Sequence, residues 1–137
     1  MCGNTKGNNV TKDDFQIRDD FKSASENYTN SFLKNKNAFS DDKSVIIFTQ
    51  GFKGEKIIVK QNSKSIYSEY TITNLKRQYA ASFAFNNSLP ITIFDNFSKH
   101  EITIEPKHSE KHKFIYVMKE SNGNFKITLS NTLRNLK

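Results

Sequence analysis

The sequence predicts an all-β protein, an antiparallel β-sandwich of about eight short strands that follows a polar N-terminal extension. From Ser44 onward apolar and polar residues alternate, which is the period of a half-buried strand. Turn-forming residues interrupt this alternation about every 8–12 residues, as they do in sandwiches. No helical stretch separates the expected strands, so we expect no parallel βαβ units. Immunoglobulin-like and jelly-roll arrangements both fit the pattern.

Composition divides the chain into three segments. Residues 1–12 are polar and linker-like, and we interpret them as a tether. Residues 13–43 are transitional, with widely spaced apolar side chains, and form either a short helix or an extended arm that adds a strand. Residues 44–137 hold the regular alternation and are expected to form the β-sandwich domain.

The transitional segment contains one helical pattern, over about residues 26–35. Three apolar side chains fall on one face of such a helix, namely Tyr28, Phe32 and Leu33. The acidic pairs at residues 13–14 and 19–20 are candidates to cap or charge a helix N-terminus, because carboxylates are favourable there.

Each expected strand lies between turn signals. The first expected strand, residues 45–49, is a continuous apolar run suited to the centre of a sheet. Asn62-Ser63 predicts a tight hairpin, and Asn122-Gly123 predicts a hairpin with a type I′ turn, which requires a positive φ at both central residues. Residues 106–111 are expected to be a polar connection. The expected strands are 45–49, 56–61, 65–73, 78–85, 91–94, 101–105, 113–119 and 124–130.

The charge is unevenly distributed. The chain has a formal net charge of +7, and residues 1–43 carry seven basic and seven acidic side chains, so the entire excess lies on residues 44–137. A basic domain attracts anions such as nucleic acid, anionic lipid headgroups, phosphorylated glycans or an acidic protein face. The alternative is that scattered lysines serve solubility alone.

The densest basic cluster lies in the expected connection between two strands. Its members are Lys107, His108, Lys111, His112 and Lys113, with Lys99 and His100 just upstream. Loops held by a rigid scaffold often carry binding residues, so this cluster is the candidate site for an anionic ligand. The alternative is a solvated charged loop.

Two histidines in that cluster, His108 and His112, have the spacing of a metal site on a helix. That spacing guarantees nothing in a loop, and the neighbouring lysines repel a cation. We therefore expect no metal site and no cofactor.

The motifs of catalysis are also missing. The sequence has no Gly-x-Ser-x-Gly elbow and no glycine-rich phosphate loop, and Cys2 has no histidine or acid close to it in the sequence. We therefore expect a protein without catalytic residues.

A nucleic-acid site would need exposed aromatic rings among basic residues. The nearest approach to this pattern is Tyr67, Tyr70, Lys76, Arg77 and Tyr79. Because these aromatics alternate as core residues do, we do not expect nucleic acid as the partner.

Cys2 is the only cysteine, and it precedes a polar segment that begins Gly3-Asn4. This start resembles that of a mature bacterial lipoprotein, in which the lipid-bearing cysteine follows the cleaved signal peptide, and Met1 then takes the place of a removed export signal. The richness in Asn, Lys and Ile is similar to that of Bacteroidetes proteins. The resemblance implies a lipid on Cys2 and a location in the cell envelope, with membrane contact through the lipid alone. A cytosolic protein with a chance cysteine is the alternative.

The function we expect is that of a non-catalytic, lipid-anchored envelope protein whose sandwich binds a protein or an anionic glycan. The alternative is an inhibitor or immunity protein that neutralises an envelope-targeting toxin or hydrolase. A third class, a cytosolic nucleic-acid binder, would lose affinity steeply with salt. No oligomeric state is predicted.

Overall fold

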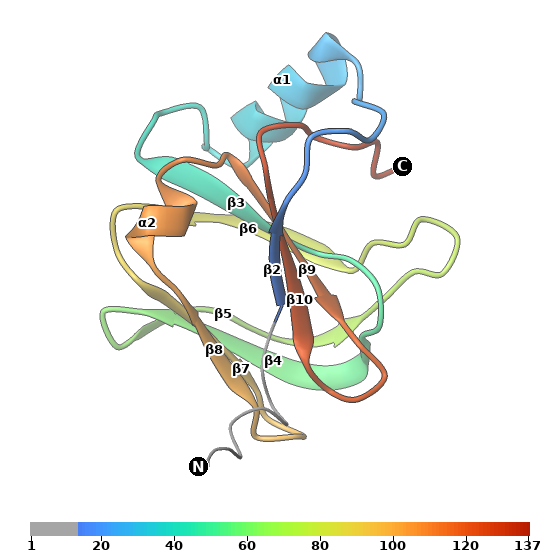
Figure 1. Cartoon of the computed structure of the whole chain (residues 1–137), viewed down its shortest axis with the longest axis vertical. Helices are drawn as coiled ribbons and strands as arrows, with labels where there is room; N and C mark the ends of the chain where they lie inside the picture. Colours follow the sequence, from blue (N-terminus) through green and yellow to red (C-terminus); the bar gives the residue numbers. More distant parts are fainter. Residues whose placement is uncertain (1–13) are drawn as a thin grey trace, which may run out of the picture.

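The computed structural model describes residues 14–137 as two β-sheets packed face to face (Figure 1). One sheet has five strands in the order β2-β10-β9-β3-β6, and the other has four in the order β5-β4-β7-β8. The predicted all-β sandwich is confirmed, with nine strands in the described part of the chain. The elements are β2 (Asp14–Ile17), α1 (Glu26–Asn35), β3 (Lys43–Phe48), β4 (Lys53–Gln61), β5 (Lys64–Ile72), β6 (Ala81–Asn86), β7 (Ile91–Asp95), β8 (Glu101–Ile104), α2 (Pro106–Ser109), β9 (Phe114–Lys119) and β10 (Phe125–Ser130).

Two of the strand pairings are parallel, unlike the antiparallel pairing we expected throughout. β3 runs parallel to β9, and β2 runs parallel to β10. Parallel neighbours need a long connection. β3 and β9 are far apart in the chain, and the whole four-stranded sheet lies between them in sequence. This long stretch serves as the connection, so the parallel pair needs no crossover helix.

Strand β3 is buried on both faces, which explains its continuous apolar run. Ile46 and Phe48 point into the core between the two sheets. Val45 and Ile47 point to the outer face of the five-stranded sheet, where they pack with Leu33 of α1. The outer face therefore has its own apolar cluster, which the helix and the C-terminal tail cover (Figure 1).

The predicted helix over residues 26–35 is confirmed as α1. Its N-terminal cap is Ser25, whose hydroxyl accepts a hydrogen bond from the backbone N–H of Tyr28 at 3.1 Å. Capping by the acidic pair Asp19-Asp20 was a wrong prediction, since a cap must directly precede the first turn. The Asp19 carboxylate instead accepts hydrogen bonds from the Ser130 hydroxyl at 2.7 Å and the Asn131 N–H at 2.8 Å.

The extended arm is also present, because β2 adds an edge strand to β10. The helix and the arm were alternatives for one segment, and the segment contains both. Asp14 lies in β2. Asp13, the tether and the proposed lipidation site Cys2 lie outside the described residues.

The hairpins form where the sequence predicts them, but one turn type differs. Asn62 and Ser63 have φ angles of 52° and 63°, as a two-residue type I′ turn requires. In the second hairpin Gly123 has a φ of 91°, whereas Asn122 is not in the left-handed region. Residues 121–123 form a three-residue loop between Glu120 and Asn124, and the Glu120 N–H donates to the Asn124 carbonyl at 2.8 Å. The type I′ prediction for Asn122-Gly123 was therefore wrong, because the loop has one residue more than that turn allows.

Candidate functional site

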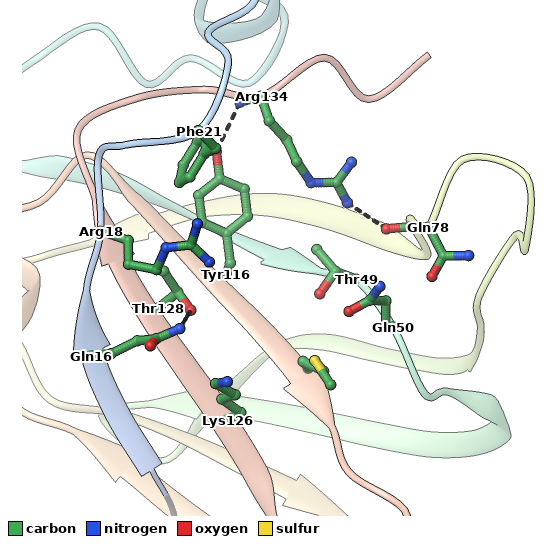
Figure 2. A pocket seen from close by; sticks show the side chains of 11 residues that line it. Gln16, Arg18, Phe21, Thr49, Gln50, Gln78, Tyr116, Lys126, Thr128 and Arg134 are labelled. Carbon is green, nitrogen blue, oxygen red and sulfur yellow. Dashed lines mark hydrogen bonds between the residues drawn. The ribbon is translucent and has the colours of Figure 1, made fainter.

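The outer face of the five-stranded sheet is open at the end that α1 does not cover, and a pocket of about 500 Å³ lies there (Figure 2). We call it the outer-face pocket. Its lining residues are Gln16, Arg18, Phe21, Thr49, Gln50, Gln78, Tyr116, Met118, Lys126, Thr128 and Arg134.

The floor of the outer-face pocket follows from the alternation of β9 and β10. Ile115 and Val117 point into the core, so Tyr116 and Met118 point outward. In β10 the side chains between the core residues are Lys126 and Thr128. In Figure 2 Gln16 and Arg18 lie on the β2 side of this floor, and Gln50 and Gln78 lie on the opposite side.

The pocket is cationic. Arg18, Lys126 and Arg134 line it, and no Asp or Glu among the described residues does. The Lys126 side chain is half-buried, and it has neither a hydrogen bond nor an ion pair within residues 14–137. The Arg18 guanidinium meets the Asp20 carboxylate at 2.9 Å, but both side chains are largely exposed, so this pair is weak. The Lys126 ammonium and part of the Arg18 guanidinium therefore remain available to an anion.

Tyr116 anchors the C-terminal tail beside the pocket. Its hydroxyl donates to the Thr132 carbonyl at 2.7 Å and accepts from the Arg134 N–H at 3.0 Å. Burial raises the pKa of Tyr116 to about 12, against the opposing effect of Arg134. The phenol is therefore neutral at physiological pH, and its contacts position Arg134.

Arg134 in turn joins the tail to the loop before β6. Its guanidinium donates to the backbone carbonyl of Gln78 (Figure 2). It also donates to the Arg77 carbonyl at 3.4 Å. This arrangement closes one side of the pocket with segments that are far apart in the sequence.

The amide side chains of the pocket differ in how far they are engaged. Gln16 donates from Nε2 to the Thr128 hydroxyl at 2.9 Å, which leaves the Gln16 Oε1 and the Thr128 hydrogen for a ligand. Gln50 has no side-chain hydrogen bond in the described part of the chain, so its whole amide is available.

The predicted basic cluster lies elsewhere, around α2 and the turn that leads into β9. Lys111, His112 and Lys113 line a second cavity of about 360 Å³, together with Asp41 and Glu110. Lys107 is exposed on α2, and the His108 ring packs against Phe15 with centroids 5.0 Å apart. The cavity thus mixes both signs of charge, and it contains three of the five residues that the sequence grouped.

Lys113 is occupied within the fold. Its ammonium donates to the backbone carbonyls of Ala38, Ser40 and Lys43 at 2.7–2.9 Å, and burial lowers its pKa. Lys113 therefore fastens the connection between α1 and β3 and has little capacity left for an anion.

We expect Lys113→Met to lower the free energy of unfolding by about 2 kcal/mol, because it leaves three carbonyls, two of them in partly buried hydrogen bonds, without their charged donor. Urea denaturation measures the change. The control is Lys111→Met at the exposed neighbouring lysine, which should cost less than about 0.5 kcal/mol. Equal effects of the two substitutions would show that Lys113 is a surface residue like its neighbour.

The two histidines do not converge on one point. His112 donates from Nδ1 to the backbone carbonyl of His108 at 2.8 Å, while the His108 ring faces Phe15. Across residues 14–137 no group of three or more His, Cys, Asp or Glu side chains is placed to hold a metal ion. His100, which precedes β8, lies beside Phe125 with ring centroids 5.4 Å apart, at the opposite end of β8 from α2.

The tyrosines that we compared with a nucleic-acid platform do not share an exposed surface. Tyr67 stacks on Phe83 at 4.8 Å and packs against the core between the sheets. Tyr79 is half-buried beneath the Arg77 guanidinium at 5.2 Å, and only Tyr70 of the three is strongly exposed, at 75%.

The sequence did not single out the residues of the outer-face pocket. The alternation of β10 does place Lys126 and Thr128 outward, but an ordinary solvated strand face has the same pattern. Arg18, Gln78 and Arg134 come from three separate segments, and no spacing in the sequence connects them.

The fold and this site define a β-sandwich domain with a cationic pocket on its outer face. No protein-family model matches the chain, and no curated protein matches it in sequence. Neither helix in the described range is long and apolar enough to cross a membrane.

Proposed function

We propose that this chain is a non-catalytic binding module of the bacterial cell envelope that holds an anionic ligand in the outer-face pocket. The supporting observation is that three cationic side chains and no described acid line one pocket of about 500 Å³. That volume falls within the range of about 300–1,000 Å³ that is usual for small-ligand sites. The basic charge of residues 44–137 adds long-range attraction for an anion.

The chemistry of the lining supports binding over catalysis. General acid–base catalysis uses a group that titrates near the working pH. No His, Cys, Asp or Glu stands among the described residues that line the pocket, and the Tyr116 phenol keeps its proton up to a pKa of about 12. What remains for the ligand is a set of hydrogen-bonding and cationic groups.

The proposed attachment to the envelope is a lipid on Cys2. It would tether the chain upstream of β2, the strand that contributes Gln16 to the pocket. Several acyl chains hold a protein stably at a membrane, since each buried CH₂ contributes about 0.8 kcal/mol. Metabolic labelling with an alkyne fatty acid should label the native protein and fail to label a Cys2→Ser variant. An unlabelled native protein would refute the anchor and leave the pocket unaffected.

For the pocket, we expect Lys126→Gln to weaken the binding of inorganic phosphate about tenfold, which corresponds to about 1.4 kcal/mol. The substitution removes the one half-buried ammonium of the pocket that has no partner in the described chain. Isothermal titration at low salt measures the affinity, and Lys64→Gln, at an exposed lysine of β5, is the charge-matched control.

Two results would contradict this site. Phosphate affinity could be lost on Lys107→Gln and Lys111→Gln and be retained on Lys126→Gln, which would place the anion at the loop around α2. Lys64→Gln could also weaken binding as much as Lys126→Gln, which would show that phosphate responds to net charge alone.

A further inference from the structure

We infer that the ligand of the outer-face pocket is an acidic saccharide, a sugar whose hydroxyls meet the amide side chains and whose carboxylate or phosphate meets Lys126 and Arg18. The inference rests on the proposed anion-binding function and adds the class of ligand. Three observations support it. Most lining side chains carry a hydrogen-bonding group, and several of these groups have no partner in the described chain. The pocket also offers no backbone partner for a peptide strand and no free ring for a nucleotide base among the described residues.

The lining carries many hydrogen-bonding groups, which a purely apolar ligand would leave unsatisfied. Apart from Phe21 and Met118, every lining side chain carries a polar group. Burial of an amide under an apolar ligand without a new hydrogen bond costs roughly 1–3 kcal/mol, and burial of an unpaired cation costs far more. The ligand must therefore offer many hydrogen-bonding groups over a small volume.

The groups without partners match hydroxyls in particular. A hydroxyl donates one hydrogen bond and accepts others, and a side-chain amide presents a donor and an acceptor next to each other. The Gln50 amide has both of these available, and the Gln16–Thr128 pair presents an acceptor on Gln16 Oε1 and a donor on the Thr128 hydroxyl. These two units lie on opposite sides of the pocket, and Lys126 lies between them in Figure 2.

A peptide strand is a poorer match because the floor offers it no backbone partner. β10 lies between β2 and β9, and β9 lies between β10 and β3, so the ladders use the backbone groups beneath the pocket. Recognition of a peptide by strand addition requires an open edge and draws its affinity from main-chain hydrogen bonds. Only side chains are available above this floor.

A nucleotide is a poorer match because no aromatic ring among the described lining residues is free to stack a base. Tyr116 is 6% exposed and meets the Phe21 ring edge to face at 5.6 Å. The Arg18 guanidinium lies over the Phe21 ring, 5.9 Å from its centroid. Single-stranded nucleic acids gain much of their affinity from bases stacked on exposed aromatic rings.

Isothermal titration of the full chain at fixed ionic strength with five probes tests the inference. The probes are digalacturonic acid, glucose 6-phosphate, maltose, inorganic phosphate and the dipeptide Glu-Glu. We expect digalacturonic acid or glucose 6-phosphate to bind at least tenfold more tightly than each of the other three. The two acidic sugars distinguish a carboxylate from a phosphate as the charged group.

Two variants separate the sugar contacts from the charge contact. Gln50→Ala should weaken the binding of the acidic sugar about tenfold and weaken phosphate binding far less, because Gln50 contributes hydrogen bonds and no charge. Lys126→Gln should weaken both. Within residues 14–137 the Gln50 side chain has no hydrogen bond to lose, since it is the Gln50 backbone carbonyl that accepts from the Lys119 N–H at 2.9 Å.

The outcomes that overturn the inference are distinct from those that overturn the proposed function. Phosphate or Glu-Glu binding as tightly as the acidic sugars, in a manner sensitive to Lys126→Gln, would leave an anion site and refute the saccharide. Maltose binding as tightly as digalacturonic acid would refute the requirement for a charged group. Failure of all five probes to bind would refute both the inference and the proposed function.

Discussion

Replacement of Lys119 by methionine is expected to lower the free energy of unfolding by about 3–5 kcal/mol. The Lys119 ammonium, on β9, forms ion pairs with Glu55 of β4 and with Asp95 of β7, so it links the two sheets. The three side chains are only 11%, 7% and 0% exposed, respectively. The substitution leaves two carboxylates in the interior without their cation, and this accounts for the expected loss.

The same triad predicts how the loss depends on pH. Burial alone raises the pKa of Asp95, but the hydrogen bonds from Lys119, Phe97 and Ser98 outweigh it, and the pKa lies below its usual value. The contribution of Asp95 to the free energy of unfolding is therefore complete above its unfolded pKa of about 3.9. It is lost as the pH falls through the lower pKa that Asp95 has in the folded protein. The pKa of Lys119 is raised, since its bonds to Asp95 and Glu55 outweigh the lowering by burial, so its contribution is lost at the alkaline end, above about pH 10.4.

Urea denaturation at pH 7 and pH 3 measures both effects. The difference between the native protein and Lys119→Met should shrink at pH 3, where the unfolded chain and then the Asp95 carboxylate gain protons. Lys60→Met, at an exposed lysine of β4, is the control and should cost less than about 0.5 kcal/mol. A Lys119→Met loss no larger than that of the control would show that the triad is solvated and does not hold the sheets together.

Gly51→Ala is expected to cost about 3 kcal/mol or more in stability. Gly51 has a φ of 92°, and a Cβ atom built there would lie 1.8 Å from the backbone carbonyl oxygen of Lys119. The left-handed backbone accounts for about 1–2 kcal/mol, and the clash with a backbone atom adds about 1–3 kcal/mol. Because Gln50 is the adjacent residue and lines the outer-face pocket, the shift should also disturb the pocket.

Gly54→Ala is the matched control for this prediction. Its φ is 106°, and a Cβ there has no neighbour within 4 Å, so the variant carries the backbone cost without the clash. We expect a loss of about 1–2 kcal/mol from Gly54→Ala in the same denaturation assay. Equal losses from the two variants would mean that the turn at Gly51 moves away from Lys119 at no cost.

The sequence predicted the sandwich well because its strands alternate regularly and its core is strongly apolar. The run that became β3 and the helix α1 were both visible in the chain, since each depends on local periodicity. The parallel pairing of β2 with β10 was not visible, because a four-residue edge strand has too short a pattern to specify its partner. The loop at Asn122-Gly123 differs from the prediction by one residue, and local sequence does not fix loop length.

The site was harder to predict because charge in the sequence does not reveal which head groups are free. The sequence placed Lys113 in a basic cluster that we predicted to bind an anion, yet in the fold its ammonium donates to three backbone carbonyls within residues 38–43. Lys126 had the signature of an ordinary surface lysine, yet it lies on the floor of a pocket that separate segments enclose. Both outcomes depend on tertiary contacts far apart in the sequence.

The most direct test of the outer-face pocket is a backbone-assigned NMR titration of the full chain with inorganic phosphate. We expect the largest amide shift changes at residues 16, 18, 49, 50, 126, 128 and 134, which line the pocket, with smaller changes at residues 107–113. Changes centred on residues 107–113, or changes spread evenly over the basic surface, would contradict the outer-face pocket as the binding site.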